Sequence, residues 1–526
     1  MIQLRDYQCE GLNAIWQYFA NGGKGHPCIA WPTGTGKSIV PAEFIRTTML
    51  RWPNQRFLMI THVKELIEQN AEVMRRIWPN APLGIYSAGL KQKQSALPIV
   101  FGGIQSMIKH PSLFGHRDMI FIDEAHLVSQ DDSSMYISFI KTMEMINSNI
   151  KVVGMSATPY RMGQGMITDE GLFTDIVHDI TKLDEFNRLI AQGYLSPLVP
   201  KRTRTELDVS DVGMAKGDFI GSQLQAAVDK NDVTRDGLKE VVECGQNRRS
   251  WLIFASGIEH AEHIAEMLNE FGIDCAPVHS KRTGEFNDQA IRAFKANQLR
   301  AIVNFSKLTT GFNHPNIDLI ADFRPTMSIP LHVQKLGRGT RPAEGKSNCL
   351  VLDFSRNVPR LGPINDPVIP KKKGTKEGDI PVKICDNCGT YNHLKVRFCT
   401  ECGQEFQFQV KIVPKAGNTE ILRSDMPVVE TFDVDKVIYV KRQKLGKPPY
   451  IQATYFCGMQ GFNEFCFPEH NGYAKHRFSN WWKQRHETDP PGTVIDALKY
   501  VNELRTPKRI RVWCNRRYPE VLSAEF

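Results

Sequence analysis

The sequence predicts an α/β protein: two tandem domains, each built on a parallel sheet, then a four-cysteine zinc knuckle and a small C-terminal domain of mixed α/β or β-barrel-like type. Three observations lead to this prediction. Two series of short apolar runs alternate with helical periods, as parallel α/β units do. Four of the twelve cysteines form two close pairs, and beyond them the pattern changes to short strands. At 526 residues, the chain also exceeds what one hydrophobic core normally serves.

The two series place the expected elements of the tandem domains. The first predicts a helix over 63–78 and buried strands over 28–30, 57–60, 97–101, 119–122 and 151–155. The second predicts helices over 258–270 and 286–297 and strands over 251–254, 275–278, 301–303, 317–321 and 349–352. Two sheets of similar size indicate two domains with a cleft between them.

The pattern breaks after residue 353, where prolines and a run of three lysines at 371–373 predict an extended basic linker. After residue 430 we expect strands over 436–441, 450–456, 462–467 and 509–513 and helices over 474–485 and 494–504. The expected regions are therefore a first domain (1–200), a second domain (201–360), the linker (361–381), the knuckle (382–410) and an accessory domain (430–526) that binds nucleic acid or a partner.

Composition is that of an ordinary globular protein, with 41% apolar and 23% charged residues, which excludes a fibrous or globally disordered class. No apolar run approaches the ~20 residues of a membrane span, and the first eight residues carry charges where a signal peptide needs an apolar stretch. We therefore expect a cytoplasmic protein with no membrane partner. The net charge of +9 is compatible with a polyanionic partner but does not require one.

A glycine-rich segment, Trp-Pro-Thr-Gly-Thr-Gly-Lys-Ser, follows the first expected strand. Such glycines turn backbone N–H groups onto phosphate oxygens, while Lys37 adds a fixed positive charge and the Ser38 hydroxyl can ligate Mg²⁺. Trp31 stands where a glycine normally opens the pattern, although the turn residues after it are kept. The residues expected to hold nucleotide phosphates are Thr33, Gly34, Thr35, Gly36, Lys37 and Ser38.

Two carboxylates follow the apolar run 119–122. Asp123 is placed to hold the metal, directly or through water, and Glu124 to polarise the attacking water. Either motif alone could lack a function, because short glycine-rich motifs occur by chance and acidic pairs are usually solvated surface residues. In this order, each after a strand, they predict an ATP-hydrolysing site.

The second domain carries two arginines in the segment Gln-Lys-Leu-Gly-Arg-Gly-Thr-Arg. Arg338 and Arg341 are three residues apart, so a helix would place them on neighbouring positions of one face. Such guanidinium groups can neutralise charge on the γ-phosphate in the transition state. A solvated basic face is the alternative.

The paired cysteines have the spacing of a tetrahedral thiolate zinc site, with a glycine after each pair. A redox-active pair is the alternative, but two pairs ten residues apart in a cytosolic chain favour metal. Four thiolates fill a tetrahedral coordination sphere and leave no open position, so the zinc is expected to be structural. Its ligands would be Cys385, Cys388, Cys399 and Cys402.

Taken together, these motifs resemble those of a superfamily 2 helicase of the DEAH-containing, RecA-like type. The resemblance covers residues 1–360 and implies ATP and Mg²⁺. It adds Arg5 and Gln8 as the segment that reads adenine, His126 as the last residue of the Asp-Glu-Ala-His motif, and Gln334 as a nucleotide contact. Nucleic-acid-binding or coupling roles are implied for residues 61–66, 102–106, 156–159, 254–256, 278–280 and 309–313, where Asn313 replaces the usual aspartate.

Within this superfamily, the run at 350–364 followed by a four-cysteine knuckle resembles the bacterial RadD helicase-like proteins and their phage relatives. That likeness implies a DNA helicase or translocase acting on single-stranded or branched DNA, largely without sequence preference, in repair, recombination or replication. The setting would be a bacterial or phage-infected cell, with single-strand-binding or recombination proteins as partners. The alternatives are an RNA helicase and a DNA-stimulated ATPase that clamps or recruits. A restriction-type translocase is disfavoured because no nuclease motif is found.

The C-terminal region offers a further candidate DNA contact, because basic and aromatic residues are interleaved there. Two groups are considered, one around Tyr439 and Tyr450 with Lys441, Arg442, Lys444 and Lys447, and one comprising His476, Arg477, Trp481, Trp482, Lys483 and Arg485. The alternative for the second group is that its tryptophans anchor the core of a small domain.

Overall fold

The computed structural model describes residues 3–129, 134–161, 165–169, 171–215, 217–308, 311–368, 382–394, 396–406, 429–443, 448–458, 460–470, 473–514 and 518–526. The chain forms two compact units. One comprises Met1–Phe186 with Leu195–Ser424, and the other comprises Asn187–Tyr194 with Asp425–Phe526. The expected basic stretch at 371–373 lies outside the described residues, as do Lys444 and Lys447.

The first unit begins with an eight-stranded sheet in which all strands but the last, an antiparallel edge strand, run parallel. In spatial order the strands are β10 (Asp175–Asp179), β1 (Pro27–Ala30), β7 (Lys151–Ser156), β6 (Met119–Asp123), β2 (Phe57–Thr61), β5 (Ile99–Gly103), β3 (Leu83–Ser87) and β4 (Gln92–Lys93). The central strands are buried along their whole length, as expected for a parallel sheet covered on both faces.

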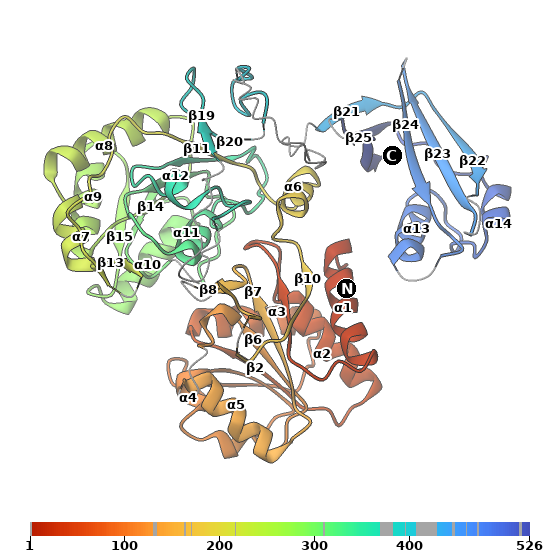
Figure 1. The fold of residues 1–526 in the computed structure, drawn as a ribbon, viewed down its shortest axis with the longest axis horizontal. Coiled ribbons are helices and arrows are strands. Elements are labelled where there is room, and N and C mark those ends of the chain that lie inside the picture. Colours follow the sequence, from red (N-terminus) through yellow and green to blue (C-terminus); the bar gives the residue numbers. More distant parts are fainter. Residues whose placement is uncertain are drawn as a thin grey trace, which may run out of the picture. The chain divides into compact units, whose positions relative to one another are not determined.

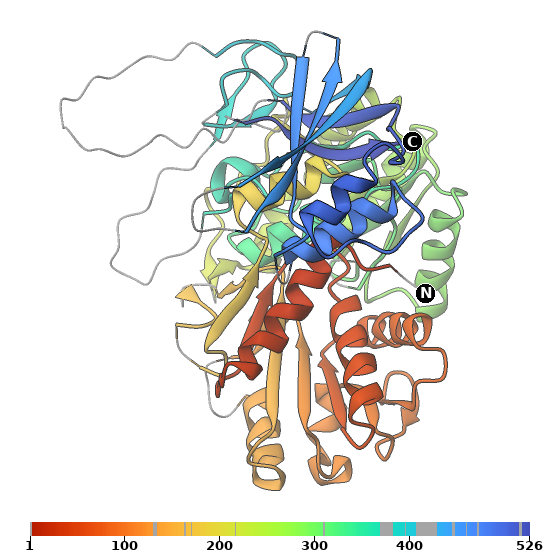
Figure 2. The ribbon, with the colours of Figure 1, turned by 90° about the vertical axis from the view of Figure 1, so that its right-hand side faces the viewer.

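Helices cover both faces of this sheet (Figures 1 and 2). One face carries α1 (Asp6–Ala20), α2 (Ile39–Arg51) and α3 (Lys64–Ile77), and the other carries α4 (Ile104–Met107) and α5 (Met135–Ile146). Phe44 of α2 packs edge-on against Phe121 of β6, while Phe139 and Ile140 of α5 join the core of the opposite face. The strands formed by the apolar runs therefore contribute side chains to two hydrophobic cores, one on each face of the sheet.

A second parallel sheet of six strands follows in the same unit. Its order is β11 (Leu198–Lys201), β18 (Cys349–Leu352), β17 (Leu319–Asp322), β14 (Trp251–Phe254), β16 (Ala301–Asn304) and β15 (Cys275–Val278). One face packs on α7 (Gly221–Val228), α8 (Asn231–Cys244) and α9 (Ile258–Glu270), and the other on α10 (Gly284–Lys295) and α11 (Ile329–Leu336). Helix α12 (Asn357–Leu361) packs against α11. The domain boundary expected after residue 200 falls inside β11, which pairs with β18.

Three short antiparallel pairs decorate this unit: β8 (Tyr160–Arg161) with β9 (Gly165–Met166), β12 (Met214–Ala215) with β13 (Asp218–Phe219), and β19 (Val382–Ile384) with β20 (Tyr391–His393) in the knuckle. Two 3₁₀ turns, Pro111–Phe114 and Ala125–Leu127, and helix α6 (Leu183–Ala191) complete the elements before the second sheet. No helix among the described residues is both long and apolar enough to cross a bilayer.

The C-terminal unit contains two three-stranded antiparallel sheets and two helices around one core. One sheet is β21 (Val429–Asp433), β25 (Arg509–Trp513) and β26 (Glu520–Glu525), and the other is β22 (Lys436–Arg442), β23 (Tyr450–Cys457) and β24 (Gln460–Cys466). The helices are α13 (Tyr473–Lys483) and α14 (Val494–Lys499). The expected fold class, two parallel-sheet domains followed by a four-cysteine cluster and a small mixed domain, is confirmed.

Candidate functional site

The glycine-rich loop joins β1 to α2 at the carboxyl end of the first sheet. Gly34 (φ 89°) and Gly36 (φ 76°) adopt left-handed backbone conformations that residues with a Cβ rarely reach. The ammonium of Lys37 donates to the Trp31 carbonyl at 3.1 Å, and burial lowers the pKa of Lys37. Ser38 precedes α2 without capping it through its side chain. The loop thus presents backbone, cation and hydroxyl as a phosphate cradle requires.

Trp31 occupies its unusual position because the first helix makes room for it. A Cβ at Gly11 of α1 would overlap the indole ring, which is fully buried. The ring packs edge-on against Tyr7 at 5.3 Å between centroids, and its N–H donates to Nδ1 of His178 at 2.8 Å. The side chain therefore points away from the loop, into the core between α1 and the sheet.

The segment expected to read adenine lies against the same loop. The Gln8 amide donates to the Thr35 carbonyl at 3.1 Å and accepts from the Arg5 backbone N–H at 3.0 Å. The Tyr7 hydroxyl also donates to the Thr35 carbonyl, at 2.7 Å, and accepts from the Arg5 guanidinium at 3.0 Å. Tyr7, which the sequence argument did not single out as a contact, thus fixes the loop as firmly as Gln8 does.

Two carboxylates stand at the carboxyl end of β6. Asp123 is buried and lies 3.4 Å from the amide nitrogen of Asn70 on α3, and burial raises its pKa, with the neighbouring Glu124 adding to the shift. Glu124 has a left-handed backbone (φ 53°), which is uncommon for a residue other than glycine. Asn70 is a functional candidate that the sequence did not reveal. An asparagine within a helix carries no sequence signal that identifies its partner in the folded protein.

His126 connects these carboxylates to the segment after β7. Its Nδ1 lies 2.9 Å from the Ser156 hydroxyl and 3.4 Å from the Glu124 carboxylate. Burial lowers the pKa of His126 to about 3, so the ring is neutral near pH 7. Ser156 in turn donates to the Thr158 carbonyl at 3.0 Å. The imidazole of His126 contacts both Ser156 and Glu124, so it links the position of residues 156–159 to that of the Glu124 carboxylate.

The two arginines of the second domain do not lie on a helix, contrary to the expectation. Helix α11 starts where the Ser328 hydroxyl accepts from the Leu331 N–H, and it ends at Leu336 because the glycines at 337 and 339 favour a turn. Arg338 and Arg341 follow in that turn and both donate to the Phe312 carbonyl, at 2.6 and 3.1 Å. Gln334 remains on α11 and is buried.

The arginine turn touches the phosphate loop within the same compact unit. The Thr340 hydroxyl donates to the Thr33 carbonyl at 3.3 Å, and a Cβ at Gly337 would overlap the Thr33 hydroxyl. A second contact joins the sheet domains where the Gln69 amide donates to the Gly311 carbonyl. The following Asn313 is exposed, and residues 309 and 310 lie outside the described part.

The positive charges around this contact favour a bound anion. Burial lowers the pKa of Arg338 to about 10 and that of Arg341 to about 9, and both lie close enough to Lys37 to lower its pKa further. Arg338 is buried, and Lys37 and Arg341 are partly buried. Glu124 and Asp123 offset part of the repulsion between these three cations, and an anionic ligand would offset the rest. Nucleotide phosphates carry the matching charge.

Among the described residues, several buried polar atoms near this contact have no hydrogen-bond partner. They include Oγ1 of Thr33, Oγ1 of Thr158, Oδ1 of Asn70 and Oε2 of Glu124, the last lying 3.4 Å from Nδ1 of His126. Buried polar atoms are normally hydrogen-bonded, so such a cluster indicates a position that a ligand or its waters complete. Together with Asp123 at the end of β6 and Ser38 at the start of α2, these residues offer the oxygen ligands that Mg²⁺ prefers, so they fit the expected metal and nucleotide.

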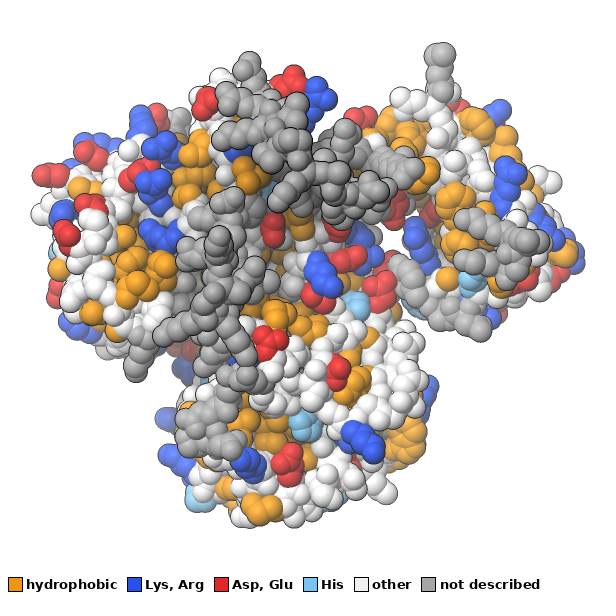
Figure 3. Space-filling model, viewed as in Figure 1, with side chains coloured by type: hydrophobic (Ala, Val, Ile, Leu, Met, Phe, Trp, Pro, Cys, Tyr) orange, Lys and Arg blue, Asp and Glu red, His pale blue; other side chains and the backbone are white. Residues whose placement is uncertain are grey.

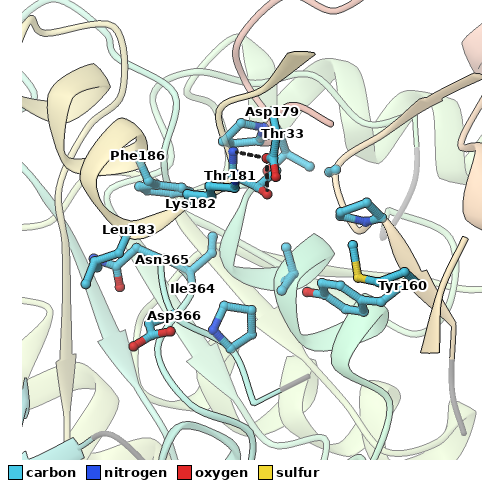
Figure 4. Close-up of a pocket in the computed structure, with 16 residues that line it drawn as sticks. Thr33, Tyr160, Asp179, Thr181, Lys182, Leu183, Phe186, Ile364, Asn365 and Asp366 are labelled. Carbon is cyan, nitrogen blue, oxygen red and sulfur yellow. Dashed lines mark hydrogen bonds between the residues drawn. The ribbon is translucent and has the colours of Figure 1, made fainter. Parts of the chain in front are cut away.

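A cavity of about 320 Å³ opens on the Thr33 side of the loop (Figure 4). Its lining includes Pro32 and Thr33 of the loop, Ala157, Pro159 and Tyr160 after β7, and Ile364–Pro367 after the second sheet. The Asp179 carboxylate, on its wall, accepts from the Thr181 N–H and hydroxyl at 2.9 and 2.7 Å. Lys37, Asp123 and Glu124 are not among the lining residues, so this cavity adjoins the phosphate cradle without containing it.

The four expected zinc ligands converge. Their sulfur atoms all lie within 4.8 Å of one another, and Cys385–Cys402 and Cys388–Cys399 are each 3.6 Å apart. Zn–S bonds of about 2.3 Å in a tetrahedron place sulfurs about 3.8 Å apart, so the cluster fits zinc. A hydrogen bond from Asn387 is the main cause that lowers the pKa of Cys402 to about 6, which favours the thiolate a metal needs.

The knuckle is attached to the second sheet domain. Lys201 of β11 forms a bridge with Thr390, and the Arg202 N–H donates to the Gly389 carbonyl at 2.9 Å. On its other side, His393 lies 2.8 Å from the Asp366 carboxylate, which lines the cavity beside the phosphate loop. These contacts agree with a metal that holds the knuckle on the domain.

The segments expected to contact nucleic acid lie at the carboxyl ends of β2, β5, β14 and β15. Gln105 after β5 donates to the His62 carbonyl at 3.2 Å, which ties the first two segments together. On the face in Figure 3, basic and acidic side chains are interspersed over both sheet domains. The net positive charge is therefore not gathered into one basic patch on that face.

The basic and aromatic helix of the C-terminal unit is largely a core element. Trp481 and Trp482 are buried, and the buried Arg485 donates to the Tyr455 hydroxyl at 2.8 Å and stacks 4.4 Å from the Trp481 ring centroid. The alternative interpretation, tryptophans that anchor the core, is correct for these residues. Tyr439 also faces inward, edge-on to Trp481.

Comparison with known proteins gives two family matches. Residues 1–161 match the type III restriction enzyme res subunit, and residues 233–343 match the helicase conserved C-terminal domain. Over 380 residues the chain is 28% identical to the putative mitochondrial ATP-dependent helicase irc3 of Schizosaccharomyces pombe, covering 70% of this chain and 60% of that one. Over 364 residues it is 25% identical to the putative ATP-dependent helicase IRC3 of Saccharomyces cerevisiae, covering 67% and 51%.

The chain therefore spans little more than half the length of these curated relatives. Among solved structures, a fragment of a putative HsdR subunit of a type I restriction enzyme from Vibrio vulnificus YJ016 is similar in fold, with a TM-score of 0.50 and 18% identity. That likeness covers 69% of this chain and 66% of the other.

Proposed function

Because the chain is an ATP-hydrolysing member of the superfamily 2 helicases, we propose that it is a DNA motor. It would be a helicase or translocase that remodels single-stranded or branched DNA in repair, recombination or replication. The Asp-Glu-Ala-His motif and the resemblance of residues 350–364 and the knuckle to RadD-like proteins support this choice. The whole protein's substrate and partners belong to the proposal.

One observation carries the proposal furthest: cations from both sheet domains meet at the phosphate loop. Lys37 belongs to the first domain, while Arg338 and Arg341 reach the same place from the second. An anion bound there would draw the two domains together, and its cleavage would release them. A site shared in this way supports a motor over a kinase, which needs no second sheet domain to complete its charge.

Each residue has a role in this scheme that its position supports. Lys37 holds the phosphates, and Asp123 and Ser38 would hold Mg²⁺, which when bound neutralises the developing charge. Glu124 accepts the proton of the attacking water. Arg338 and Arg341 stabilise the charge that builds up as the terminal phosphate departs.

The neutral His126 transmits the state of Glu124 to residues 156–159 through its 2.9 Å contact with Ser156. If each domain holds the DNA backbone through the segments at its strand ends, alternating closure and opening moves the protein along one strand. Contacts of this kind are made to phosphates, so binding would depend on salt and little on sequence.

The testing experiment measures steady-state ATP hydrolysis with no nucleic acid, single-stranded DNA, duplex DNA, forked DNA or single-stranded RNA at equal nucleotide concentration. Stimulation by DNA, strongest with forks or single strands, is expected, followed by strand displacement on the fork. Stimulation by RNA alone would overturn the choice of DNA and leave the ATP site in place. Brisk DNA-stimulated hydrolysis without strand displacement or translocation would favour a clamp or recruitment factor.

A matched pair of variants checks the site itself. Lys37→Ala is expected to abolish hydrolysis while DNA binding stays within a few-fold, because the loop holds phosphates of the nucleotide and not of the DNA. Lys93→Ala, on the exposed edge strand β4, serves as the control. Undiminished turnover in Lys37→Ala would sink the assignment of the phosphate loop.

A further inference from the structure

The sheet formed by β22, β23 and β24 has one face in the core of the C-terminal unit and one face toward solvent. Side chains alternate along each strand, and Ile451, Ala453 and Tyr455 point inward to the core. The residues at the alternate positions form what we call the outer face. They are Lys436, Ile438, Val440, Arg442, Tyr450, Gln452, Thr454, Phe456, Gly461, Asn463 and Phe465.

The composition of the outer face is unusual for the solvated side of an antiparallel sheet, which is normally polar. It carries three aromatic rings, and Phe465 is 45% exposed while Ile438 is 42% exposed. It also carries two cations, and none of its eleven described residues is a carboxylate. Exposed apolar groups gathered in this way usually mark a binding surface.

Each end of the outer face combines an aromatic ring with a cation. At one end the Lys436 ammonium lies 5.0 Å from the centroid of the Phe456 ring. At the other, Arg442 stands opposite Tyr450 in the ladder, and the Tyr450 and Phe465 rings meet edge-on at 5.8 Å. Tyr450 and Phe456 are six residues apart on one strand, which separates the two ends by about 20 Å.

Polar groups fill the centre of the outer face. The Gln452 amide donates to the Asn463 oxygen at 2.9 Å, and the Thr454 hydroxyl donates to the same oxygen at 2.7 Å. The Arg442 guanidinium donates to the Gln452 oxygen at 3.1 Å. This network holds the amides flat against the sheet and fixes the arginine beside the aromatic pair.

We propose that the outer face binds single-stranded DNA, with bases stacked on the exposed Phe465 and the partly exposed Tyr450 and Phe456 and phosphates beside Arg442 and Lys436. Every base has a π-face, so stacking tolerates any sequence, and cations without nearby carboxylates suit a phosphate backbone. A nucleic-acid strand is preferred to a peptide because the face combines aromatic rings with two cations and, among its described residues, carries no carboxylate. The inference rests on the proposed function, since the ligand is the strand that the motor would act on.

The test uses the full chain and a thymidine oligonucleotide carrying 5-iodouracil, cross-linked by light and mapped by mass spectrometry, with affinity measured by fluorescence anisotropy. Cross-links are expected within β22–β24. The double variant Tyr450→Ala/Phe465→Ala should weaken binding about ten-fold, as loss of stacking does elsewhere. The double variant Lys436→Glu/Arg442→Glu tests the same face through its charge. It should weaken DNA binding most at low salt, where contacts to phosphates contribute most to affinity.

Two exposed residues of the helices provide matched controls, Ile495→Ala on α14 and Lys475→Glu on α13, which should bind as the unaltered chain does. Cross-links confined to residues 1–360, together with unchanged affinity in both double variants, would overturn the inference. Cross-links within β22–β24 to an RNA oligonucleotide but not to the DNA would overturn it as well.

The ATP measurements separate this inference from the proposed function. DNA-stimulated hydrolysis with no cross-link in β22–β24 would refute the outer face alone. Absence of any stimulation by DNA would refute the DNA motor, while cross-links in β22–β24 would still support a DNA site on the C-terminal unit.

Discussion

The ammonium of Lys335 and the carboxylate of Asp322 form a fully buried ion pair, with N–O distances of 2.7 and 2.6 Å. The pair joins α11, which precedes the arginine turn, to the end of β17. Asn357 completes it by donating to Asp322 at 2.9 Å, and Lys335 also donates to the Arg324 carbonyl at 2.8 Å. Helix α11 ends at Leu336, two residues before Arg338. The position of Arg338 is therefore fixed by this hydrogen-bonded network rather than by helical geometry.

Removing one member of this pair is expected to cost more than removing both. Lys335→Met leaves the Asp322 carboxylate buried without its partner, which typically costs roughly 3–5 kcal/mol of unfolding free energy. The double variant Lys335→Met/Asp322→Asn should recover part of that loss. Urea unfolding of the full chain measures both, and equal losses in the single and double variants would show that the pair does not hold α11.

Arg338→Lys should lower ATP turnover by a factor on the order of 10³ while nucleotide binding stays within a few-fold, because the guanidinium acts on charge that grows only during cleavage. Lysine keeps the charge but loses the planar guanidinium, whose Nη1 donates to the Phe312 carbonyl. Hydrolysis and fluorescent-nucleotide binding are measured side by side, with Arg292→Lys on the exposed surface of α10 as the control. A defect in binding equal to the defect in turnover would contradict the transition-state role.

Zinc removal should destabilise the second sheet domain without weakening fork binding. The knuckle bridges to β11 through Lys201 and Thr390, so its loss exposes that sheet edge. Cys402→Ser is expected to bind no zinc, to lower the midpoint of thermal unfolding by several degrees and to bind forked DNA within two- to three-fold of the unaltered chain. Cys244→Ser, away from the cluster, is the control. Fork affinity lost ten-fold at unchanged thermal stability would instead make the knuckle a DNA contact.

Stability should fall as the pH drops below about 6.5. Burial lowers the pKa of His126 to about 3 and the pKa values of His260, His314 and His332 to about 4. Between those values and the ordinary 6.5, the unfolded chain binds protons that the native chain does not, so each histidine destabilises the fold by about 1.4 kcal/mol per pH unit. The raised pKa of Asp353, about 6, acts in the opposite direction between pH 6 and 4, as does the raised pKa of Asp123, but these carboxyl groups are fewer than the four histidines.

Urea unfolding at pH 7.5, 6.0 and 5.0 measures this slope. His260→Gln should flatten it, because its ring is fully buried and its Nδ1 accepts from the Ser256 N–H at 3.3 Å. His116→Gln, at an exposed position, should leave the slope unchanged. Constant stability across this range would mean that the buried rings gain access to solvent before the chain unfolds.

Much of the architecture was readable from the sequence because its signals are local. Strands such as β14 and helices such as α9 were placed to the residue by apolar runs and a 3.6-residue period. The edge strands β10 and β11 were missed, because short half-buried strands carry no continuous apolar run. Glycine turns and paired cysteines are likewise recognisable from their spacing in the sequence. For this reason the phosphate loop and the knuckle could be located from the sequence.

The sequence by itself determined which groups the molecule owns: a phosphate loop, two carboxylates after a strand, two arginines and four thiols. Only the tertiary structure decided which of them meet. Asn70 facing Asp123, Gln69 holding Gly311 and Trp31 turned toward Gly11 depend on contacts between residues far apart in the chain. The same packing buried Trp481 and Arg485 and left Phe465 exposed. The sequence offered Trp481 and Arg485 as DNA contacts and did not single out Phe465, because burial is a property of the packed fold.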